Sequence, residues 1–392
     1  MKTPANWTSV PFWSLYRRSK TLGYPTEALL SVYRDYGVIR KSDRDDNWNR
    51  PGEDMSAYQI VEEGDLVLNK MKTWQGSLGV SPYRGIVSPA YFVYKKQSND
   101  SERFLHFALR SEQYIKTYAS ISKGVRPNQW DLQPEQLDLM KVLLPPRATQ
   151  HCIVDYLERE TNEIDAMIAT MGELAKQLEV RRRQSIDASF AGIEETAPLW
   201  SLTNGIVDCP HTTPEVDDEG PAEAVRTASI RSGKYLPGNG IKVSFETARQ
   251  RNGAFPPRVG DLFFTREAPA GEATLVPEGA FCLGQRMVLI RVEPEVTDSR
   301  FLLYALYTKS VQEEFRLSAG GSTVVNLKLG TIRATQVPLI ALPEQRRIAD
   351  HLDEVTSRID QMLVKVAELK FLLIERRAAL ITDVVTGRKE VA

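Results

Sequence analysis

The chain has 392 residues, more than one ordinary domain holds, which suggests two or three domains. Hydrophobic residues make up 42% and charged residues 26%, with 24 Gly and 22 Pro scattered along the chain, so the composition excludes collagen-like, mucin-like and disordered proteins. The net charge of −1 is unevenly distributed: residues 1–146 carry 20 Lys and Arg against 16 Asp and Glu, whereas residues 147–195 carry 6 against 10. The basic first segment permits a phosphate-contacting face but does not establish one.

No apolar run approaches the roughly 20 residues that cross a bilayer, and Met1–Val10 lacks the basic start and apolar core of a signal peptide. We therefore expect a cytoplasmic protein without a membrane partner. The three cysteines, Cys152, Cys209 and Cys282, are too widely spaced for a disulfide framework or a four-cysteine zinc site. We expect reduced thiols and no metal.

Residues 1–146, called head 1, have mixed α and β patterns. Residues 57–68 are predicted to form strand, turn and strand, and Gly79–Tyr94 repeats this pattern. Phe104–Thr117 has the period of an amphipathic helix. Head 1 is therefore predicted to be a small twisted sheet with flanking helices.

The loops of head 1 combine basic, amide and aromatic side chains. Arg and Lys bind phosphates and guanine O6 and N7, and Asn and Gln can bind adenine N6 and N7. The predicted DNA-binding residues of head 1 are Arg40, Lys41, Arg44, Asn49, Lys70, Lys72, Trp74, Gln75, Lys123, Arg126 and Asn128.

Residues 147–192 have the period of a long helix that packs against another helix. Apolar residues recur at steps of three and four, no proline follows Pro146, and Gly192 stands where a left-handed cap would end the helix. Such a helix is on the order of 60 Å long. Its predicted seam contains Ile153, Leu157, Ile164, Met171 and Leu178, with Met167, Leu174 and Arg181 in the intervening positions.

Residues 193–341, called head 2, show the strand and helix patterns of head 1 again, with Phe301–Phe315 as the helix. Cys209-Pro210-His211 places a thiol near an imidazole, but no further ligands are nearby, so we interpret it as a turn. The predicted DNA-binding residues of head 2 are Arg226, Arg231, Lys234, Arg249, Arg251, Arg266, Arg286, Ser322, Thr323, Asn326 and Lys328.

Residues 342–392 are predicted to form a second long helix and a C-terminal tail. The seam contains Ile348, Leu352, Ile359, Val366 and Leu373, with Met362 and Leu369 between them and Arg376 between Leu373 and Leu380. An apolar seam must be buried, and the simplest partner is the first helix, in parallel or antiparallel orientation. The alternative is a helical hairpin that merely joins the heads. Arg181 and Arg376 argue mildly against this alternative, because a charged residue in a seam needs a partner and so specifies the register of the two helices.

An internal repeat is the strongest signal in the chain. Residues 142–192 align with 337–387 without a gap at a shift of 195, and 17 of the 51 positions are identical. Outside this block, Trp13-Ser14-Leu15 matches Trp200-Ser201-Leu202, and Gly64-Asp65-Leu66 matches Gly260-Asp261-Leu262. The chain therefore consists of two copies of one unit, each a head followed by a long spacer helix.

This organisation resembles the specificity subunit of a type I restriction-modification enzyme. The similarity covers essentially the whole chain and is carried by Leu342–Ala349, which opens the second helix, by Arg376–Gly387, which closes it, and by the Gly124-Val125-Arg126 and Gly320–Thr323 loops. The first copy departs from the family pattern at Arg147–His151, where Arg-Ala-Thr-Gln-His replaces the Pro-Glu-Gln-Arg-Arg of the second copy.

The resemblance implies a mixed α/β fold with a pseudo-twofold internal repeat, in which two similar α+β target-recognition domains are held apart by an antiparallel pair of long coiled-coil helices. Each domain would read one half of a bipartite DNA site, and the helix pair would set the spacing and dock the methyltransferase subunits. The implied partners are double-stranded DNA, two modification subunits and restriction/translocase subunits. The chain itself would be non-catalytic and hold no cofactor, since S-adenosylmethionine, ATP and Mg would belong to the partners.

Two other classes of function remain open. A two-headed protein–protein scaffold without DNA binding would show the same repeat and seam. A self-sufficient enzyme would need a catalytic constellation, and the sequence has no G-x-x-x-x-G-K-[ST], H-E-x-x-H or G-x-S-x-G motif. Affinity for random duplex falls steeply with salt for a DNA reader, which distinguishes it from a scaffold.

Overall fold

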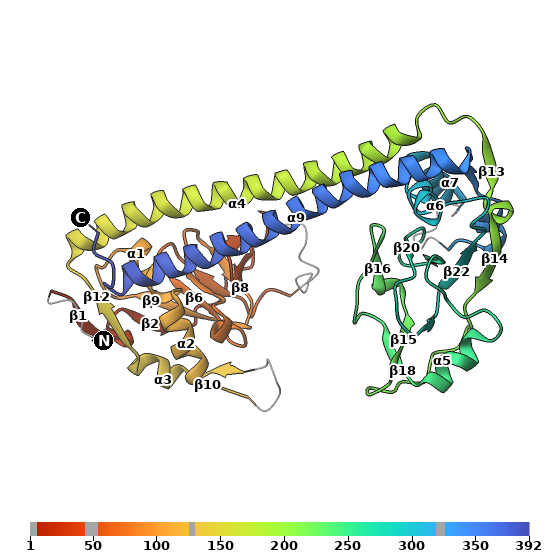
Figure 1. The fold of residues 1–392 in the computed structure, drawn as a ribbon. Coiled ribbons are helices and arrows are strands. Elements are labelled where there is room, and N and C mark those ends of the chain that lie inside the picture. The colour runs from red at the N-terminus through yellow and green to blue at the C-terminus, as the bar shows by residue number, and fades with distance from the viewer. Residues whose placement is uncertain (1–5, 44–53, 125–129, 319–325, 392) are drawn as a thin grey trace. The chain divides into compact units, whose positions relative to one another are not determined.

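The chain forms two compact units, seen here in a computed structural model (Figure 1). Unit 1 combines Met1–Met171 with Glu368–Ala392, and unit 2 is Gly172–Ala367. Two long helices, α4 (Arg147–Phe190) and α9 (Leu342–Val385), each contribute a segment to both units. The structure describes residues 6–43, 54–124, 130–318 and 326–391.

Head 1, in unit 1, is built on a four-stranded antiparallel sheet. Its order is β2 (Tyr16–Ser19), β9 (Tyr91–Lys96), β6 (Leu66–Asn69) and β7 (Leu78–Val80). Four smaller pairs join β1 (Thr8–Pro11) to β12 (Lys141–Leu144), β3 (Leu30–Tyr33) to β4 (Gly37–Arg40), β5 (Gln59–Val61) to β8 (Gly85–Val87), and β10 (Ser122–Lys123) to β11 (Asp131–Leu132). The helices are α1 (Glu102–Leu109), α2 (Glu112–Ser120) and α3 (Pro134–Leu139).

Head 2, in unit 2, repeats this plan. Its four-stranded sheet has the order β14 (Thr203–Asp208), β22 (Met287–Val292), β19 (Leu262–Thr265) and β20 (Ala273–Leu275). The other strands are β13 (Thr196–Pro198) with β23 (Gln336–Pro338), β16 (Ile230–Arg231) with β17 (Lys234–Tyr235), and a three-stranded sheet of β18 (Ile241–Val243), β15 (Ala222–Val225) and β21 (Phe281–Leu283). The helices are α5 (Phe245–Asn252), α6 (Ser299–Leu306), α7 (Lys309–Ser318) and α8 (Leu329–Ala334).

The internal repeat extends through the heads. The two four-stranded sheets have corresponding strand orders, and the same Gly-Asp turn precedes the third strand of each order, β6 in head 1 and β19 in head 2. Gly64 and Gly260 adopt φ of +86° and +94°, and the carboxylates of Asp65 and Asp261 accept hydrogen bonds from the backbone three residues earlier. The predicted mixed α/β fold with two similar domains is confirmed.

The prediction of one continuous helix at Phe104–Thr117 is wrong, because two helices, α1 and α2, occupy this region. The matching region of head 2 is likewise divided into α6 and α7. A side chain of a long helix caps the start of the second helix of each pair. In head 1, Glu112 N donates to Thr382 Oγ1 of α9 at 3.3 Å. In head 2, Lys309 N donates to Asp187 Oδ1 of α4 at 2.7 Å. The cap comes from a distant segment, so local periodicity did not reveal it.

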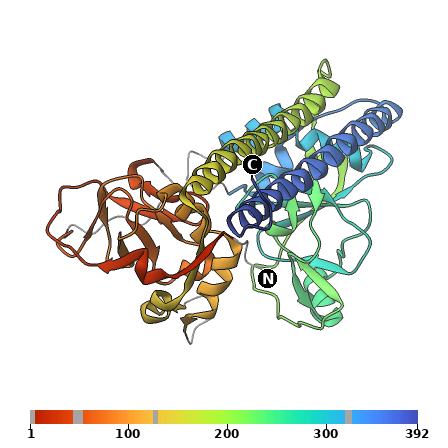
Figure 2. The same ribbon diagram turned by 90° about the vertical axis from the view of Figure 1, so that its left-hand side faces the viewer.

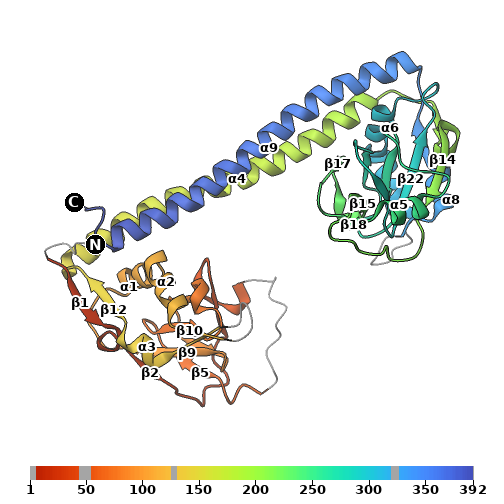
Figure 3. The same ribbon diagram turned by 60° about the horizontal axis from the view of Figure 1, so that its bottom comes forward.

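The long helices run antiparallel. In unit 1, Ile153 and Leu157 at the start of α4 pack in one core with Val384 and Val385 at the end of α9. In unit 2, the end of α4 packs against the start of α9, with Ile186, Phe190, Ile348 and Leu352 in one cluster. In each unit the two helical segments lie side by side (Figures 1, 2 and 3). Of the two orientations that periodicity left open, the antiparallel one is confirmed.

The seam differs from the prediction at its intervening positions. Ile153, Leu157, Ile164 and Leu178 on α4 and Ile348, Leu352, Ile359 and Leu373 on α9 are buried, and Met171 and Val366 are half-buried. The intervening residues Met167, Leu174, Met362 and Leu369 are wrong, because their side chains are between 37% and 50% exposed.

Two threonines that the seam prediction did not include turn inward. Thr161 and Thr356 are buried, and their hydroxyls donate to the carbonyls of Leu157 at 2.6 Å and Leu352 at 2.7 Å. These polar side chains can be buried because their own helix satisfies them. Further along, Arg182 and Arg377 are the paired arginines of the helix pair, so the assignment of Arg181 and Arg376 to the seam is wrong by one residue.

Each head is anchored to the start of its following helix by a buried glutamine. Oε1 of Gln150 accepts from Ser101 N at 2.8 Å, and its Nε2 donates to Pro145 O at 3.0 Å. Gln345, 195 residues later, accepts from Asp298 N at 2.9 Å and donates to Ile340 O at 2.8 Å. Ser101 and Asp298 are the N-cap residues of α1 and α6, so the repeat conserves a head-to-helix joint within this chain.

Candidate nucleic-acid interface

Several predicted DNA-binding residues of head 1 gather at the turn that follows β6. Leu132 N donates to Lys70 O at 3.0 Å, which brings the segment after Trp130 beside this turn. The rings of Trp74 and Trp130 pack with centroids 4.7 Å apart. Lys123 lies in β10, opposite Asp131 of β11. The structure thus brings together Lys70, Lys72, Trp74, Gln75 and Lys123.

The sequence reasoning missed Arg18 and Lys20, which add positive charge to the same region. The Arg18 guanidinium carbon and Lys70 Nζ lie 4.4 and 5.0 Å from the centroid of the Phe92 ring. Partial burial lowers the pKa of Lys70, and the charges of Arg18 and Lys20 lower it further. The signal in the sequence is the basic run Arg17-Arg18-Ser19-Lys20, which lies on and directly after β2.

The other predicted residues of head 1 lie in different surroundings. Arg40 packs its guanidinium over the Tyr83 ring, 4.7 Å from the centroid. Lys41 begins a 3-10 turn, and its backbone N donates to Leu29 O at 2.8 Å. Six predicted residues lie outside the described part of the chain: Arg44, Asn49, Arg126, Asn128, Ser322 and Thr323.

In head 2, three predicted residues line one polar pocket of about 280 Å³. Arg266 and Arg286 come from the turns beside β19 and β22, and Asn326 precedes α8. Asn326 Nδ2 donates to Glu267 Oε1 at 2.5 Å, and Arg286 Nε lies 3.1 Å from Glu267 Oε2. The pocket is completed by Gln285 and by His211, which sequence analysis assigned only to a turn.

Two other predicted residues have their charges engaged within the unit. Lys234 Nζ lies 2.5 Å from Asp360 Oδ2 on α9, so it joins the β16–β17 hairpin to the long helix. The Arg251 guanidinium donates to the carbonyls of Pro210, Thr212 and Leu283 at 2.9–3.4 Å and thereby holds the chain beside His211. The remaining predicted residues of head 2, Arg226, Arg231, Arg249 and Lys328, are exposed on separate elements.

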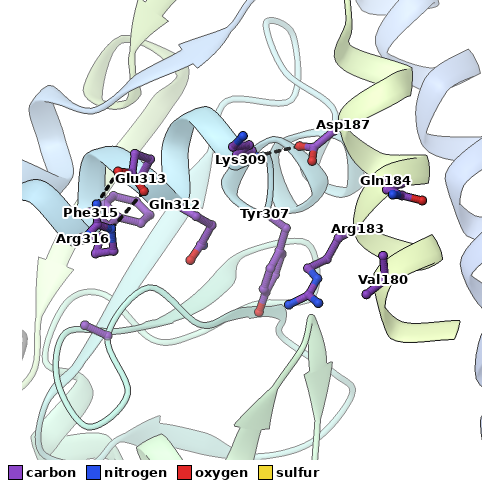
Figure 4. A pocket seen from close by; sticks show the side chains of 11 residues that line it. Val180, Arg183, Gln184, Asp187, Tyr307, Lys309, Gln312, Glu313, Phe315 and Arg316 are labelled. Carbon is purple, nitrogen blue, oxygen red and sulfur yellow. Dashed lines mark hydrogen bonds and ion pairs between the residues drawn. The ribbon is translucent and has the colours of Figure 1, made fainter. Parts of the chain in front are cut away.

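A larger pocket of about 550 Å³ lies where head 2 meets α4 (Figure 4). Arg183, Gln184 and Asp187 line it from α4, and Tyr307 and Gln312 are among the residues that line it from head 2. It adjoins the bond from Lys309 N to Asp187 that caps α7. The pocket therefore belongs to the joint between head and helix.

Within the described ranges, no helix is long and apolar enough to cross a membrane. In the same part of the chain, no three His, Cys, Asp or Glu side chains are grouped so that they could hold a metal ion.

Comparisons with known proteins all lead to one family. The family described as "Type I restriction modification DNA specificity domain" matches residues 223–369. The type I restriction enzyme MjaX specificity subunit of Methanocaldococcus jannaschii is 21% identical over 79% of this chain and 75% of that protein. The type I restriction enzyme EcoBI specificity subunit of Escherichia coli is 30% identical over 27% of this chain and 22% of that protein.

Two solved structures share the fold. One comes from work on the complex assembly and conformational transition of the type I R-M system; it is 17% identical, has a TM-score of 0.74, and the match covers 99% of this chain and all of that one. The other is the HsdS subunit from Thermoanaerobacter tengcongensis, 16% identical with a TM-score of 0.52 and 99% coverage of both chains. Together with the domain matched over residues 223–369, the curated relatives and the repeated architecture, they indicate a specificity subunit of a type I restriction-modification system.

Proposed function

We propose that this chain is the DNA-recognition subunit of a type I restriction-modification complex. Head 1 reads one half of a bipartite site and head 2 reads the other. The antiparallel α4–α9 pair sets the spacing between the half-sites and docks the modification subunits.

The observation that carries the proposal is the repetition of both joints between head and helix. The Gln150 and Gln345 anchors fix α1 and α6 to the start of a long helix, and the Thr382 and Asp187 caps fix α2 and α7 to the end of the other. A head held at two points on a helix pair cannot turn freely against it. The number of helical residues between the two joints then determines the distance between half-sites.

Contacts to DNA are supported by the character of the exposed side chains. In head 1, Arg18, Lys20 and Lys70 concentrate positive charge beside the Trp74–Trp130 pair, which suits phosphate binding with release of counterions. In head 2, the pocket around Arg286 offers donors and acceptors of the kind that read base edges.

Docking of partner subunits is supported by apolar side chains exposed on the helices. On α9, Phe371, Leu372 and Ile374 are 62%, 60% and 47% exposed, and large exposed apolar groups that lie close together typically mark protein–protein contacts. We propose that the modification subunits dock on this exposed apolar surface of α9. The restriction/translocase subunits then join the complex through the modification subunits.

We propose that catalysis resides in the partners. S-adenosylmethionine would be used by the modification subunits, and ATP and Mg by the restriction/translocase subunits, while this chain would hold no cofactor. Its own part is to position DNA so that a docked enzyme reaches an adenine.

Mapping methylated adenines genome-wide, in cells with and without this chain, tests the proposal. We expect modification at one bipartite sequence, lost when the chain is deleted. An unchanged methylation map, together with no salt-dependent binding of duplex DNA in the presence of the modification subunits, would contradict it and favour a protein–protein scaffold.

A further inference from the structure

The pocket around Arg286 in head 2 combines two cations with two anions. The Arg266 guanidinium pairs with Asp208, and Arg286 pairs with Glu267, so the formal charges cancel. His211 and Gln285, which also line the pocket, are polar and exposed. A phosphate would gain little from a site in which each guanidinium already faces a carboxylate. A neutral ligand with hydrogen-bonding edges fits this chemistry better.

The rear of the pocket is rigid. Arg266 has a side chain only 15% exposed, and its Nε donates to Leu327 O at 3.0 Å. Arg266 N donates to Arg286 O at 2.9 Å, and Leu327 N donates to Arg266 O at 3.0 Å. Arg266 therefore ties together the segments that carry Asp208, Arg286 and Asn326, which makes it a positioning residue for the pocket.

Arg286 is held so that one edge of its guanidinium stays available. Its Nε contacts Glu267 Oε2 at 3.1 Å, and its side chain is 56% exposed. Among the described residues, no hydrogen bond engages its two Nη atoms. Arg286 also adopts φ of +65°, a conformation that residues other than glycine rarely take and that functional sites often retain. The parallel N–H bonds of the two Nη atoms match O6 and N7 of guanine.

We propose that Arg286 reads a guanine in the half-site recognised by head 2, with Glu267 orienting the guanidinium and Arg266 fixing the pocket behind it. This inference rests on the proposed function and adds to it a specific residue and a specific base. Glu267 also repels phosphate, which favours the base edge over the DNA backbone.

Selection of bound sequences from duplexes with a randomised central segment tests this inference. The full chain is used in complex with its modification subunits, as wild type and as Arg286→Ala, Arg286→Lys and Arg258→Ala. Arg258 lies exposed before β19 of the same head and is not among the predicted DNA-binding residues, so it provides a matched loss of one positive charge. Affinity for the selected wild-type site is then measured over a series of salt concentrations.

We expect Arg286→Ala to lose the preference for guanine at one position of one half-site and to weaken binding of that site roughly 10- to 100-fold. Arg286→Lys should not restore the preference, because an ammonium cannot form the parallel pair of bonds. The other half-site should keep its sequence, and Arg258→Ala should leave all base preferences intact.

Two results would overturn the inference while leaving the proposed function standing. One is an unchanged selected sequence for Arg286→Ala. The other is a uniform loss of affinity with a shallower salt dependence that Arg286→Lys restores, which is the behaviour of a phosphate contact. Failure of the wild-type complex to select any bipartite sequence would instead contradict the proposed function itself.

Discussion

Nη1 of Arg182 on α4 lies 2.6 Å from Oδ1 of Asp360 on α9, and the internal repeat supplies a second pair at the corresponding positions. In the repeat, which has a shift of 195 residues, Arg182 corresponds to Arg377 and Asp165 corresponds to Asp360. Arg377 Nε lies 3.0 Å from Asp165 Oδ1, a close ion pair without hydrogen-bond geometry. Each long helix thus supplies one arginine and one aspartate, so a slip of the helices would break both pairs.

Removing Asp360 should destabilise unit 2 more than removing Arg182. Asp360 also contacts Lys234, so Asp360→Asn leaves the largely buried Arg182 and the exposed Lys234 without their shared carboxylate, whereas Arg182→Met leaves Asp360 with Lys234. We expect Arg182→Met to lower the free energy of unfolding by about 2 kcal/mol, and Asp360→Asn to lower it further. Chemical denaturation measures both.

Arg358 and Glu354 supply the control for these variants, because their pair is exposed on the surface of α9. Arg358→Ala should change the free energy of unfolding by less than about 0.5 kcal/mol. Equal effects of Arg182→Met and Arg358→Ala would contradict a structural role for the pair across the helices.

The glutamine anchors should be among the most sensitive polar sites. Gln345 is fully buried, and Gln345→Leu leaves the backbone N of Asp298 and the carbonyls of Val296 and Ile340 without this partner. We expect a loss of about 3 kcal/mol in the free energy of unfolding, since each unpaired buried group costs about 1–3 kcal/mol. Gln361→Leu, at an exposed site on α9, is the control. A loss below about 1 kcal/mol at Gln345 would show that the joint does not depend on it.

Acid should destabilise head 1 through His106. Burial and the neighbouring Arg110 guanidinium lower the pKa of His106 to about 3. The unfolded chain protonates this ring below its usual pKa of about 6.5, so it binds more protons than the native state, and stability falls as the pH drops from about 6.5 towards 3. Between pH 7 and pH 5 the free energy of unfolding should fall by about 2 kcal/mol from this group.

His106→Gln should remove that part of the pH dependence in urea denaturation at the two pH values. His151→Gln, at an exposed position on α4, is the matched control. The explanation fails if His106→Gln loses as much stability as the wild type between pH 7 and pH 5.

The exposed apolar side chains of α9 offer a test of partner docking. The repeat places Lys176 and Gln177 of α4 at the positions that correspond to Phe371 and Leu372 of α9. Phe371→Asp with Leu372→Asp should weaken association with the modification subunits at least about 10-fold without loss of helical content. The matched control is Lys176→Asp with Gln177→Asp. Sedimentation of the mixed subunits measures the effect, and equal weakening by both double variants would rule out a specific docking surface at Phe371 and Leu372.

The sequence predicted the repeated plan because helices and glycine caps leave local patterns. Gly192 and Gly387 have the expected positive φ of +85° and +72° just past the helix ends. The choice between Arg181 and Arg182 was not local, since only the aspartate on the other helix determines which arginine turns inward. Strands β5 and β6 were predicted in order, but their partners, β8 for one and β7 with β9 for the other, depend on tertiary pairing.

The candidate site was less predictable than the fold. A basic loop residue can bind DNA or serve the fold, and Lys234 and Arg251 make contacts within unit 2 that no sequence pattern indicates. The sequence indicates only a turn at His211, and its place in one pocket with Arg266 and Arg286 depends on tertiary packing. Which charged groups converge is decided by the packing of loops far apart in the chain.

In the proposed function, the length of the helix pair sets the spacing of the half-sites. Deleting residues 166–172 from α4 together with their repeat counterparts 361–367 from α9 removes about 10 Å of helix while keeping the apolar register. Selection of bound duplexes with the modification subunits should then give the same two half-sites with a spacer shortened by about three base pairs. Continued preference for the original spacer, at undiminished affinity, would contradict the claim.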